Sequence, residues 1–292
     1  MLSSLPPATQ WLFGALAGFT LFYLWNIGSA VLRRPNPADR KPNWKAAGVG
    51  FVTAFFDTLG IGSFATTTSL FRWLKLIDDA DLPGTLNVGI TLPTVVQAII
   101  YTRLIPVDPA TLILMIGASV VGAWLGVPIV ARLDKRRIQI GMGVALIVAA
   151  AIFLGGLLKV LPAGGDALAL TGTTLALGLI GNFVLGALMT LGIGLYGPCM
   201  ILVALLGLTP AAAFPIMMGS CAFLMPVASA RFTKTERYDM RLALGLAIGS
   251  IPAVLIAALL VVSLPLDYVK WLVIIVVTYT AITLLRAAAR GT

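Results

Sequence analysis

The chain contains apolar runs that are too long for the core helices of a soluble domain. Residues 110–131, 138–158 and 242–263 carry no charged side chain, and each exceeds the roughly 18 residues that can cross a bilayer as an α-helix. Lipid offers no hydrogen-bond partners, so a spanning segment must pair its own backbone groups, as a helix does. Only 11% of the 292 residues are charged, against about 25% in soluble domains. We therefore predict an all-α, polytopic membrane protein.

The basic residues fall into three groups between the predicted spans. Loops on the cytoplasmic side of a membrane carry an excess of lysine and arginine. We interpret the groups as topogenic charge in a bacterial inner (plasma) membrane, where contact with anionic lipid is compatible. The net charge of +9 therefore does not indicate a nucleic-acid partner. The groups are Arg33, Arg34, Arg40, Lys41 and Lys45; Arg132, Lys135, Arg136 and Arg137; and Arg231, Lys234, Arg237 and Arg241.

Histidine is absent, and the two cysteines, Cys199 and Cys221, lie in apolar segments. This composition excludes histidine-based catalysis and histidine-ligated haem, and it offers neither a disulfide framework nor a zinc-binding spacing. We expect no metal site and no cofactor. The two thiols are interpreted as small buried apolar side chains, with a role toward a sulfur-containing substrate as the alternative.

The sequence Thr-Leu-Gly-Ile-Gly occurs twice, at residues 58–62 and again at residues 190–194. Two glycines two positions apart interrupt a helix. Such a break at membrane depth is tolerated only where it is buried in protein or lines a cavity. A matched pair of breaks, one in each half of a chain, indicates the binding site of a transporter.

The positions of the basic groups predict the topology. Residues 46–74 must enter and leave on the cytoplasmic side, and residues 168–206 must start and end outside. We interpret both as re-entrant hairpins of two half-helices, with a long tilted helix as the alternative. Two inverted repeats result, residues 46–160 and 161–292, preceded by an extra transmembrane helix at 11–32 and a basic linker within residues 1–45. The full spans are 85–103, 110–131 and 138–158, then 211–230, 242–263 and 266–286.

The residues after each break predict an anion site. Ser63 is a suitable N-cap, and Pro198 suits the first turn of a helix. Two half-helices that start near the membrane centre would direct free N–H groups and positive dipole ends at the same point. The alternative is that the glycines only allow close helix packing. The candidate substrate-binding residues are Thr58, Gly60, Gly62, Ser63, Thr66 and Thr67; Gly192, Gly194, Tyr196, Gly197 and Cys199; and Asn87, Thr91 and Ser220.

Asp57 directly precedes the first break, whereas Met189 occupies the matching place before the second. An ionisable residue at membrane depth is a functional candidate, and burial favours its neutral form. Asp57 is therefore a candidate for proton or ion coupling, with capping of the returning half-helix as an equal alternative. Asn87, Thr91 and Ser220 can also make ordinary interhelical hydrogen bonds, and Gln97 is interpreted as interhelical packing.

These motifs resemble the TauE/SafE family of sulfite exporters and sulfonate permeases. The resemblance covers residues 46–286 and rests on the two glycine breaks, on residues 87–91 and 218–221, and on the Val107-Asp108 and Tyr238-Asp239 span starts. It implies two four-segment repeats and a sulfur oxyanion or organosulfonate as substrate. The chain departs from the family's longer glycine run, because Ser63-Phe64 and Leu195-Tyr196 follow the breaks. Residues 11–32 are predicted to be an addition before the repeats.

The function that we predict is secondary transport of small anions, most specifically sulfite or an organosulfonate, by alternating access around the two breaks. A transporter or channel for another small anion, such as a carboxylate, is the alternative. An integral-membrane enzyme is a lower alternative, because Asp57, two thiols and hydroxyls do not form an acid–base or metal constellation. The expected partners are the small anion and the lipid bilayer. The sequence leaves open the direction, the coupling ion and the oligomeric state, a homodimer being one option.

Overall fold

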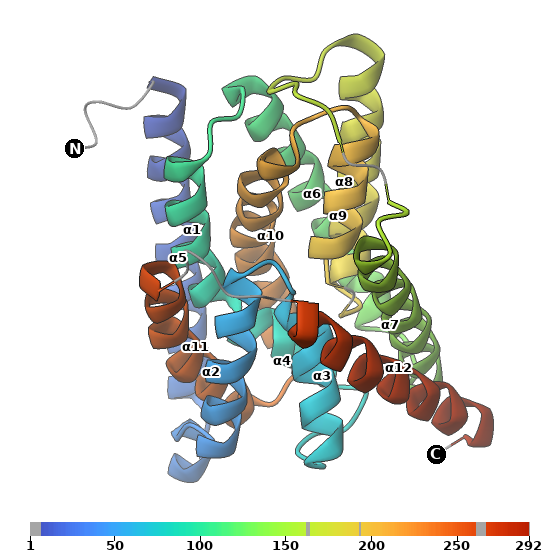
Figure 1. Ribbon diagram of the computed structural model, residues 1–292. Coiled ribbons are helices and arrows are strands. Elements are labelled where there is room, and N and C mark those ends of the chain that lie inside the picture. Colours follow the sequence, from blue (N-terminus) through green and yellow to red (C-terminus); the bar gives the residue numbers. More distant parts are fainter. Residues whose placement is uncertain (1–6, 162–163, 193, 261–266, 292) are drawn as a thin grey trace.

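Long apolar helices run side by side through the molecule (Figure 1). The computed structural model describes residues 7–161, 164–192, 194–260 and 267–291, and the regular elements of these residues are all helices. Six helices are long and apolar enough to cross a membrane, which confirms the prediction of an all-α protein with several spans. They are α1 (Pro7–Arg33), α6 (Pro109–Val130), α7 (Lys135–Leu157), α8 (Gly172–Met189), α10 (Ala213–Thr235) and α11 (Met240–Leu260).

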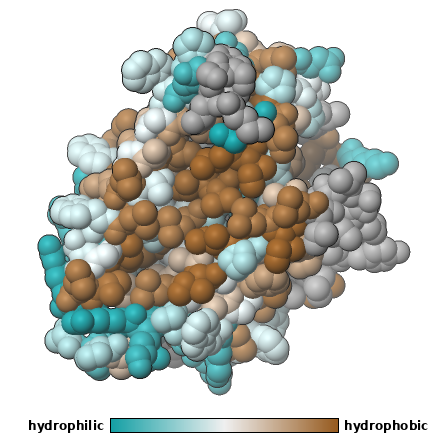
Figure 2. Space-filling view, turned by 90° about the vertical axis from the view of Figure 1, so that its left-hand side faces the viewer, coloured by the Kyte–Doolittle hydropathy of each residue, from teal (hydrophilic) through white to brown (hydrophobic). Residues whose placement is uncertain are grey.

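The spans predicted at 242–263 and 266–286 correspond to α11 and α12 (Asp267–Arg290), and residues 261–266 between them lie outside the described residues. The connection predicted around residue 162 also lies partly outside them. The exposed surface has the character expected of a membrane protein. A hydrophobic band crosses the face shown in Figure 2, and hydrophilic side chains border it at the lower end.

Helices are interrupted at both copies of the repeated sequence, as predicted. Helix α2 (Trp44–Thr58) ends before the first pair of glycines and α3 (Ser63–Trp73) follows it. Gly60 and Gly62 have φ angles of 89° and 82°, a left-handed conformation that L-residues with a side chain adopt only under strain. In the second copy α8 ends at Met189, Gly192 has a φ angle of 91°, and α9 (Tyr196–Leu205) follows.

The prediction for the start of α3 was wrong in one respect. The N-cap is Gly62 and not Ser63, and no side chain caps this helix end. Ser63 is instead the first helical residue, because the left-handed backbone at Gly62 turns the chain directly into the helix. Pro198 lies in the first turn of α9, as predicted, where its missing N–H leaves no hydrogen bond unmade.

A bend divides the span predicted at residues 85–103. The segment consists of α4 (Leu82–Gly89) and α5 (Thr91–Leu104), which are inclined by 48° to each other. Pro93 explains the bend, since it has no N–H to donate to the carbonyl of Gly89 one turn earlier. Within the bend, the hydroxyl of Thr91 donates to the carbonyl of Asn87 over 2.6 Å.

Close contacts between helix backbones join the first half of the chain to the second. Helix α2 packs on α11, where Gly249 faces the carbonyl of Ala47. Helix α8 packs on α6, where Gly186 faces the carbonyl of Ser119. Glycine at such positions lets two helices approach more closely than side chains would allow. Helix α12 packs on both α3 and α7, and α7 also contacts α9.

Ion pairs gather the loops at one end of the molecule. Between α3 and α4, Asp79 pairs with Arg72, and Asp78 lies 3.1 Å from Lys135 at the start of α7. Asp81 lies 3.8 Å from Arg237, just before α11. The Asp78–Lys135 and Asp81–Arg237 pairs are partly exposed and add little stability, but they place members of the second and third basic groups beside the end of α3.

We predict that Gly249→Ala destabilises the protein and that Gly117→Ala does not. A Cβ atom at Gly249 would overlap the Ala47 carbonyl, whereas no atom lies within 4 Å of the Cβ position at Gly117 on α6. Overpacking costs about 1–3 kcal/mol, while alanine in an open helical position gains up to about 1 kcal/mol over glycine. Thermal unfolding in detergent measures both variants, and an equal midpoint for the two would contradict this description of the α2–α11 contact.

Candidate functional site

The two glycine breaks pack directly against each other. A Cβ atom built on Gly62 would lie 3.6 Å from the Cβ of Tyr196, and one built on Gly194 would lie 3.6 Å from the Cβ of Phe64. The contacts are therefore reciprocal. Gly62 of the first break contacts Tyr196, two residues after the second break, and Gly194 of the second break contacts Phe64, two residues after the first. Helices α3 and α9 consequently start at one place inside the protein, about halfway along the long helices (Figure 1).

A small cavity of about 40 Å³ lies between the breaks. This volume admits water-sized molecules. A larger cavity of about 530 Å³ adjoins it and extends past Phe153 to Lys159, beyond the end of α7. Ile61, Phe153 and Gly197 line both cavities. Of the predicted site residues, Gly62, Gly192, Gly194, Tyr196 and Gly197 line the small cavity.

Asp57 lies at the end of α2, with only 1% of its surface exposed. The amide of Gln97, from α5, donates to Asp57 Oδ2 over 2.7 Å and lies 3.0 Å from Thr58 Oγ1. The hydroxyl of Tyr196, from α9, lies 3.2 Å from Asp57 Oδ2 and 3.0 Å from Gln97 Oε1. Tyr101 donates to the carbonyl of Thr58. A buried polar cluster therefore joins both halves of the chain beside the small cavity.

This cluster has more than one hydrogen-bonding arrangement. The Tyr196 hydroxyl carries a single hydrogen, yet Asp57, Gln97 and the sulfur of Met218 all lie within hydrogen-bonding reach of it. Asp57 Oδ1 has no hydrogen-bond partner among the described residues. Within the described residues, Asp57 makes no ion pair with lysine or arginine. Such a carboxyl can take up a proton at Oδ1.

The three candidate threonines near the first break donate their hydroxyls within the protein. Thr58 donates to the carbonyl of Ala54 over 2.8 Å, and Thr66 donates to the carbonyl of Gly62 over 3.2 Å. Thr67 donates to the hydroxyl of Thr53 over 3.0 Å, which joins α3 to α2. In this conformation these hydroxyls do not point their hydrogens at a ligand.

The candidate residues on the next helices make hydrogen bonds within and between helices. Asn87 donates to the carbonyl of Pro83 in the same helix over 2.8 Å, and its Oδ1 has no partner among the described residues. The Thr91 hydroxyl lies 3.2 Å from that of Ser229 on α10. Ser220 accepts a 2.9 Å hydrogen bond from Asn182 on α8. Gly60 faces the ring of Phe214.

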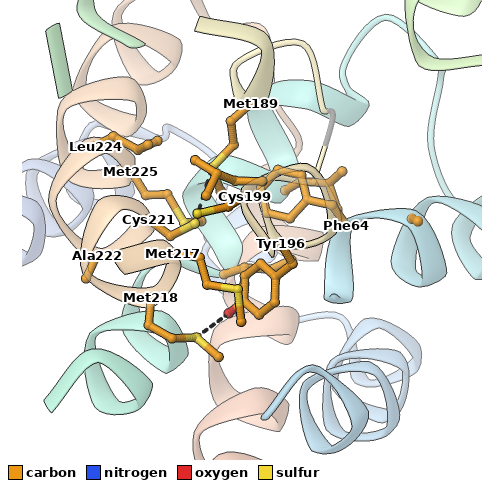
Figure 3. Close-up of a cluster of buried hydrophobic side chains, with 14 of the residues drawn as sticks. Phe64, Met189, Tyr196, Cys199, Met217, Met218, Cys221, Ala222, Leu224 and Met225 are labelled. Carbon is orange, nitrogen blue, oxygen red and sulfur yellow. Dashed lines mark hydrogen bonds between the residues drawn. The ribbon is translucent and has the colours of Figure 1, made fainter. Parts of the chain in front are cut away.

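A group of sulfur-containing side chains adjoins Tyr196 (Figure 3). Cys199 and Cys221 are fully buried, and the thiol of Cys221 donates to the sulfur of Met189 over 3.4 Å. Met217, Met218 and Met225 complete the group. Sulfur is polarizable and fills irregular spaces well, so this group gives one wall of the site an adaptable apolar surface.

Sequence reasoning missed three members of the polar cluster. Gln97 was interpreted as packing, Tyr101 was not considered, and Met218 was noted only as part of a motif. Gln97 could have been found, because an amide within an apolar span needs a buried partner and Asp57 is the one acid predicted at membrane depth. The sequence carries no comparable signal for Tyr101 or Met218, whose side chains also suit a membrane helix.

The fold and site define a class, that of polytopic helical membrane proteins in which two interrupted helices meet at a buried polar cluster. The family model described as "Sulfite exporter TauE/SafE" matches residues 1–153, slightly more than half of the chain. The protein belongs to this family, which is a family of anion transporters and not of enzymes. No curated protein and no solved structure matches the chain.

The recognition of the family is confirmed by this match. The matched residues include 11–32 and most of the first predicted repeat, residues 46–160. The division into an extra N-terminal helix and two repeats stays a prediction.

We predict that Gln97→Leu lowers stability and that Thr66→Val has little effect. Leucine has about the same size as glutamine but leaves Asp57 and Thr58 without their shared donor. Leaving buried polar groups unpaired costs about 1–3 kcal/mol. Valine matches the shape of threonine, and the Thr66 hydroxyl bonds only to carbonyls of its own turn. Thermal unfolding in detergent is the measurement, and an undiminished midpoint for Gln97→Leu would show that the cluster adds no stability.

Proposed function

We propose that the protein is a secondary transporter of small anions, with sulfite or an organosulfonate as the preferred substrate, in a bacterial inner membrane. The observation that carries the proposal is the reciprocal packing of the two glycine breaks beside a cavity and a buried polar cluster. Membership of the TauE/SafE family directs the choice of substrate toward sulfur oxyanions.

Two re-entrant hairpins, α2–α3 and α8–α9, belong to this proposal. Figure 1 supports it, because α2 rises from the lower end of the view and α3 returns there, while α8 and α9 do the same from the upper end. The helix contacts support two inverted repeats, 46–160 and 161–292. In these repeats α2 and α3 of the first are equivalent to α8 and α9 of the second, and α6 and α7 are equivalent to α11 and α12. The contact of α2 with α11 is then matched by that of α8 with α6, and the contact of α3 with α12 by that of α9 with α7.

The anion is bound where α3 and α9 begin. The first turn of a helix has N–H groups without intrahelical partners and a positive dipole end, and glycine lets an anion approach the backbone. Gly62, Gly194 and Gly197 supply such an approach from both sides of the cavity. Further hydroxyl groups come from Thr58, Ser63, Thr66 and Thr67. The three threonines donate elsewhere in this conformation, so their hydroxyls must reorient before they can bind the anion.

Asp57 couples the anion to a proton. A charged carboxylate repels an anion strongly in a medium of low dielectric constant, and among the described residues Asp57 has no cation paired with it. Tyr196 both lines the cavity and contacts Asp57. The anion therefore binds while Asp57 is protonated, and a monovalent anion transported with this proton carries no net charge across the membrane.

The geometry of the two cavities supports an alternating-access cycle. In this conformation the larger cavity joins the site to the end of the molecule that carries Lys159. Phe153 lies between the larger and the smaller cavity. Rocking of one repeat against the other would close this route and open one on the side of the basic groups.

Counterflow of labelled sulfite in proteoliposomes tests the proposal. The wild-type protein should exchange labelled sulfite for internal sulfite, and its rate should depend on pH. Sulfate, a sulfonate and acetate serve as competitors. Counterflow with acetate but with neither sulfite nor the sulfonate would replace this proposal by the carboxylate alternative, and no exchange of any anion would end it.

Asp57→Asn separates coupling from binding in the same assay. The variant keeps the hydrogen-bonding shape of the side chain but cannot exchange a proton, so sulfite exchange should persist and lose its pH dependence. Asp166→Asn, at an exposed carboxyl, is the matched control and should retain the wild-type pH profile. An unchanged profile in Asp57→Asn would count against the coupling role and favour a capping role.

A further inference from the structure

A separate cavity of about 450 Å³ lies between the C-terminal parts of α1 and α10 and shares no lining residue with the two cavities at the glycine breaks. Its walls include Arg33 and Arg34 from the end of α1 and Lys234 from the end of α10. One acidic residue, Glu236, also lines it. The cavity therefore presents three cations and one anion, an excess of positive charge that suits an anionic group.

The C-terminal end of α1 is electrostatically compatible with a neighbouring anion. Carbonyl groups at the C-terminus of a helix are unpaired and carry partial negative charge, which would oppose anion binding. Arg40 neutralises them, since its guanidinium donates to the carbonyls of Arg34 over 2.6 Å and Leu32 over 3.3 Å. Arg34 is also held in position, with its guanidinium 5.8 Å from the centre of the Tyr238 ring.

The opposite wall of this cavity is aromatic and faces outward. Phe22 and Trp25 on α1 are 42% and 68% exposed, and their ring centres lie 6.5 Å apart. Tryptophan is typical of the boundary between hydrocarbon and headgroups. Between the two walls, Thr233 of α10 donates to Asn26 of α1 over 2.8 Å. The cavity thus has a cationic side and an apolar side, separated by polar groups.

We propose that this cavity binds an anionic glycerophospholipid. Its phosphate lies among Arg33, Arg34 and Lys234, and an acyl chain follows Phe22 and Trp25 into the bilayer. A free phosphate ion would use the cations but not the aromatic wall, so the amphipathic lining favours the lipid. Basic pockets between transmembrane helices on the cytoplasmic side are typical binding sites for such headgroups. The bound lipid joins α1 to α10 and is distinct from the transported anion.

Native mass spectrometry of the full chain with added phosphatidylglycerol or phosphatidylcholine tests the proposal. The wild-type protein should retain phosphatidylglycerol and not phosphatidylcholine, a comparison that needs no variant. Arg33→Gln with Lys234→Gln should weaken phosphatidylglycerol binding by about thirtyfold, because each basic residue near an anionic lipid contributes about 1 kcal/mol. Arg34 is left unchanged to preserve its contact with Tyr238.

The matched control is the double variant Lys41→Gln with Arg136→Gln. It removes the same amount of positive charge at two exposed residues that do not line the cavity. This control should bind the lipid as the wild type does. Equal weakening in both double variants would attribute binding to diffuse surface charge and overturn the proposal. Displacement of the lipid by millimolar inorganic phosphate would also overturn it, in favour of a free-anion site. Sulfite counterflow is measured separately, so failure here leaves the transport proposal standing.

Discussion

The contact between the two glycine breaks is the constraint on which the rest of the structure depends. Gly62 packs against Tyr196 and Gly194 against Phe64, so two helices from different halves of the chain begin at one point. Interrupted helices are costly inside a bilayer unless protein surrounds them. The surrounding helices meet this need through close contacts of small residues, such as Gly249 on Ala47 and Gly186 on Ser119.

The glycine break is duplicated, but the chemistry beside it is not. Asp57 precedes the first break while Met189 precedes the second, and Phe64 after the first break corresponds to Tyr196 after the second. The polar cluster of Asp57, Gln97 and Tyr196 has no second copy among the described residues and lies beside a wall rich in sulfur. In our proposal the two repeats rock against each other, whereas a single carboxyl gives the site one place to hold a proton. This division of roles underlies the proposed transport cycle.

The sequence predicted what depends on local backbone chemistry and missed what depends on tertiary contact. Glycine pairs in apolar runs located both breaks, and Pro198 located the start of α9. The bend at Ile90 was missed, although Pro93 gives it a local cause, because proline is tolerated within transmembrane helices and does not by itself mark a division of the span. Gln97 was assigned to packing because its contact with Asp57 forms only in the folded chain, although the single acid predicted at membrane depth was a clue. Thr67 stays a candidate for substrate binding, and in this conformation its hydroxyl donates to Thr53 of α2.

Cysteine labelling from one face of the membrane tests the central claim most directly, that the two breaks are reached from opposite sides. Lys75→Cys follows α3, and Ala211→Cys follows α9; both positions are exposed. The native Cys199 and Cys221 are fully buried and should not react with a membrane-impermeant maleimide. We predict that in inside-out vesicles the reagent labels Lys75→Cys and not Ala211→Cys, and that in right-side-out vesicles the pattern reverses. Labelling of both positions from the same face would contradict the account.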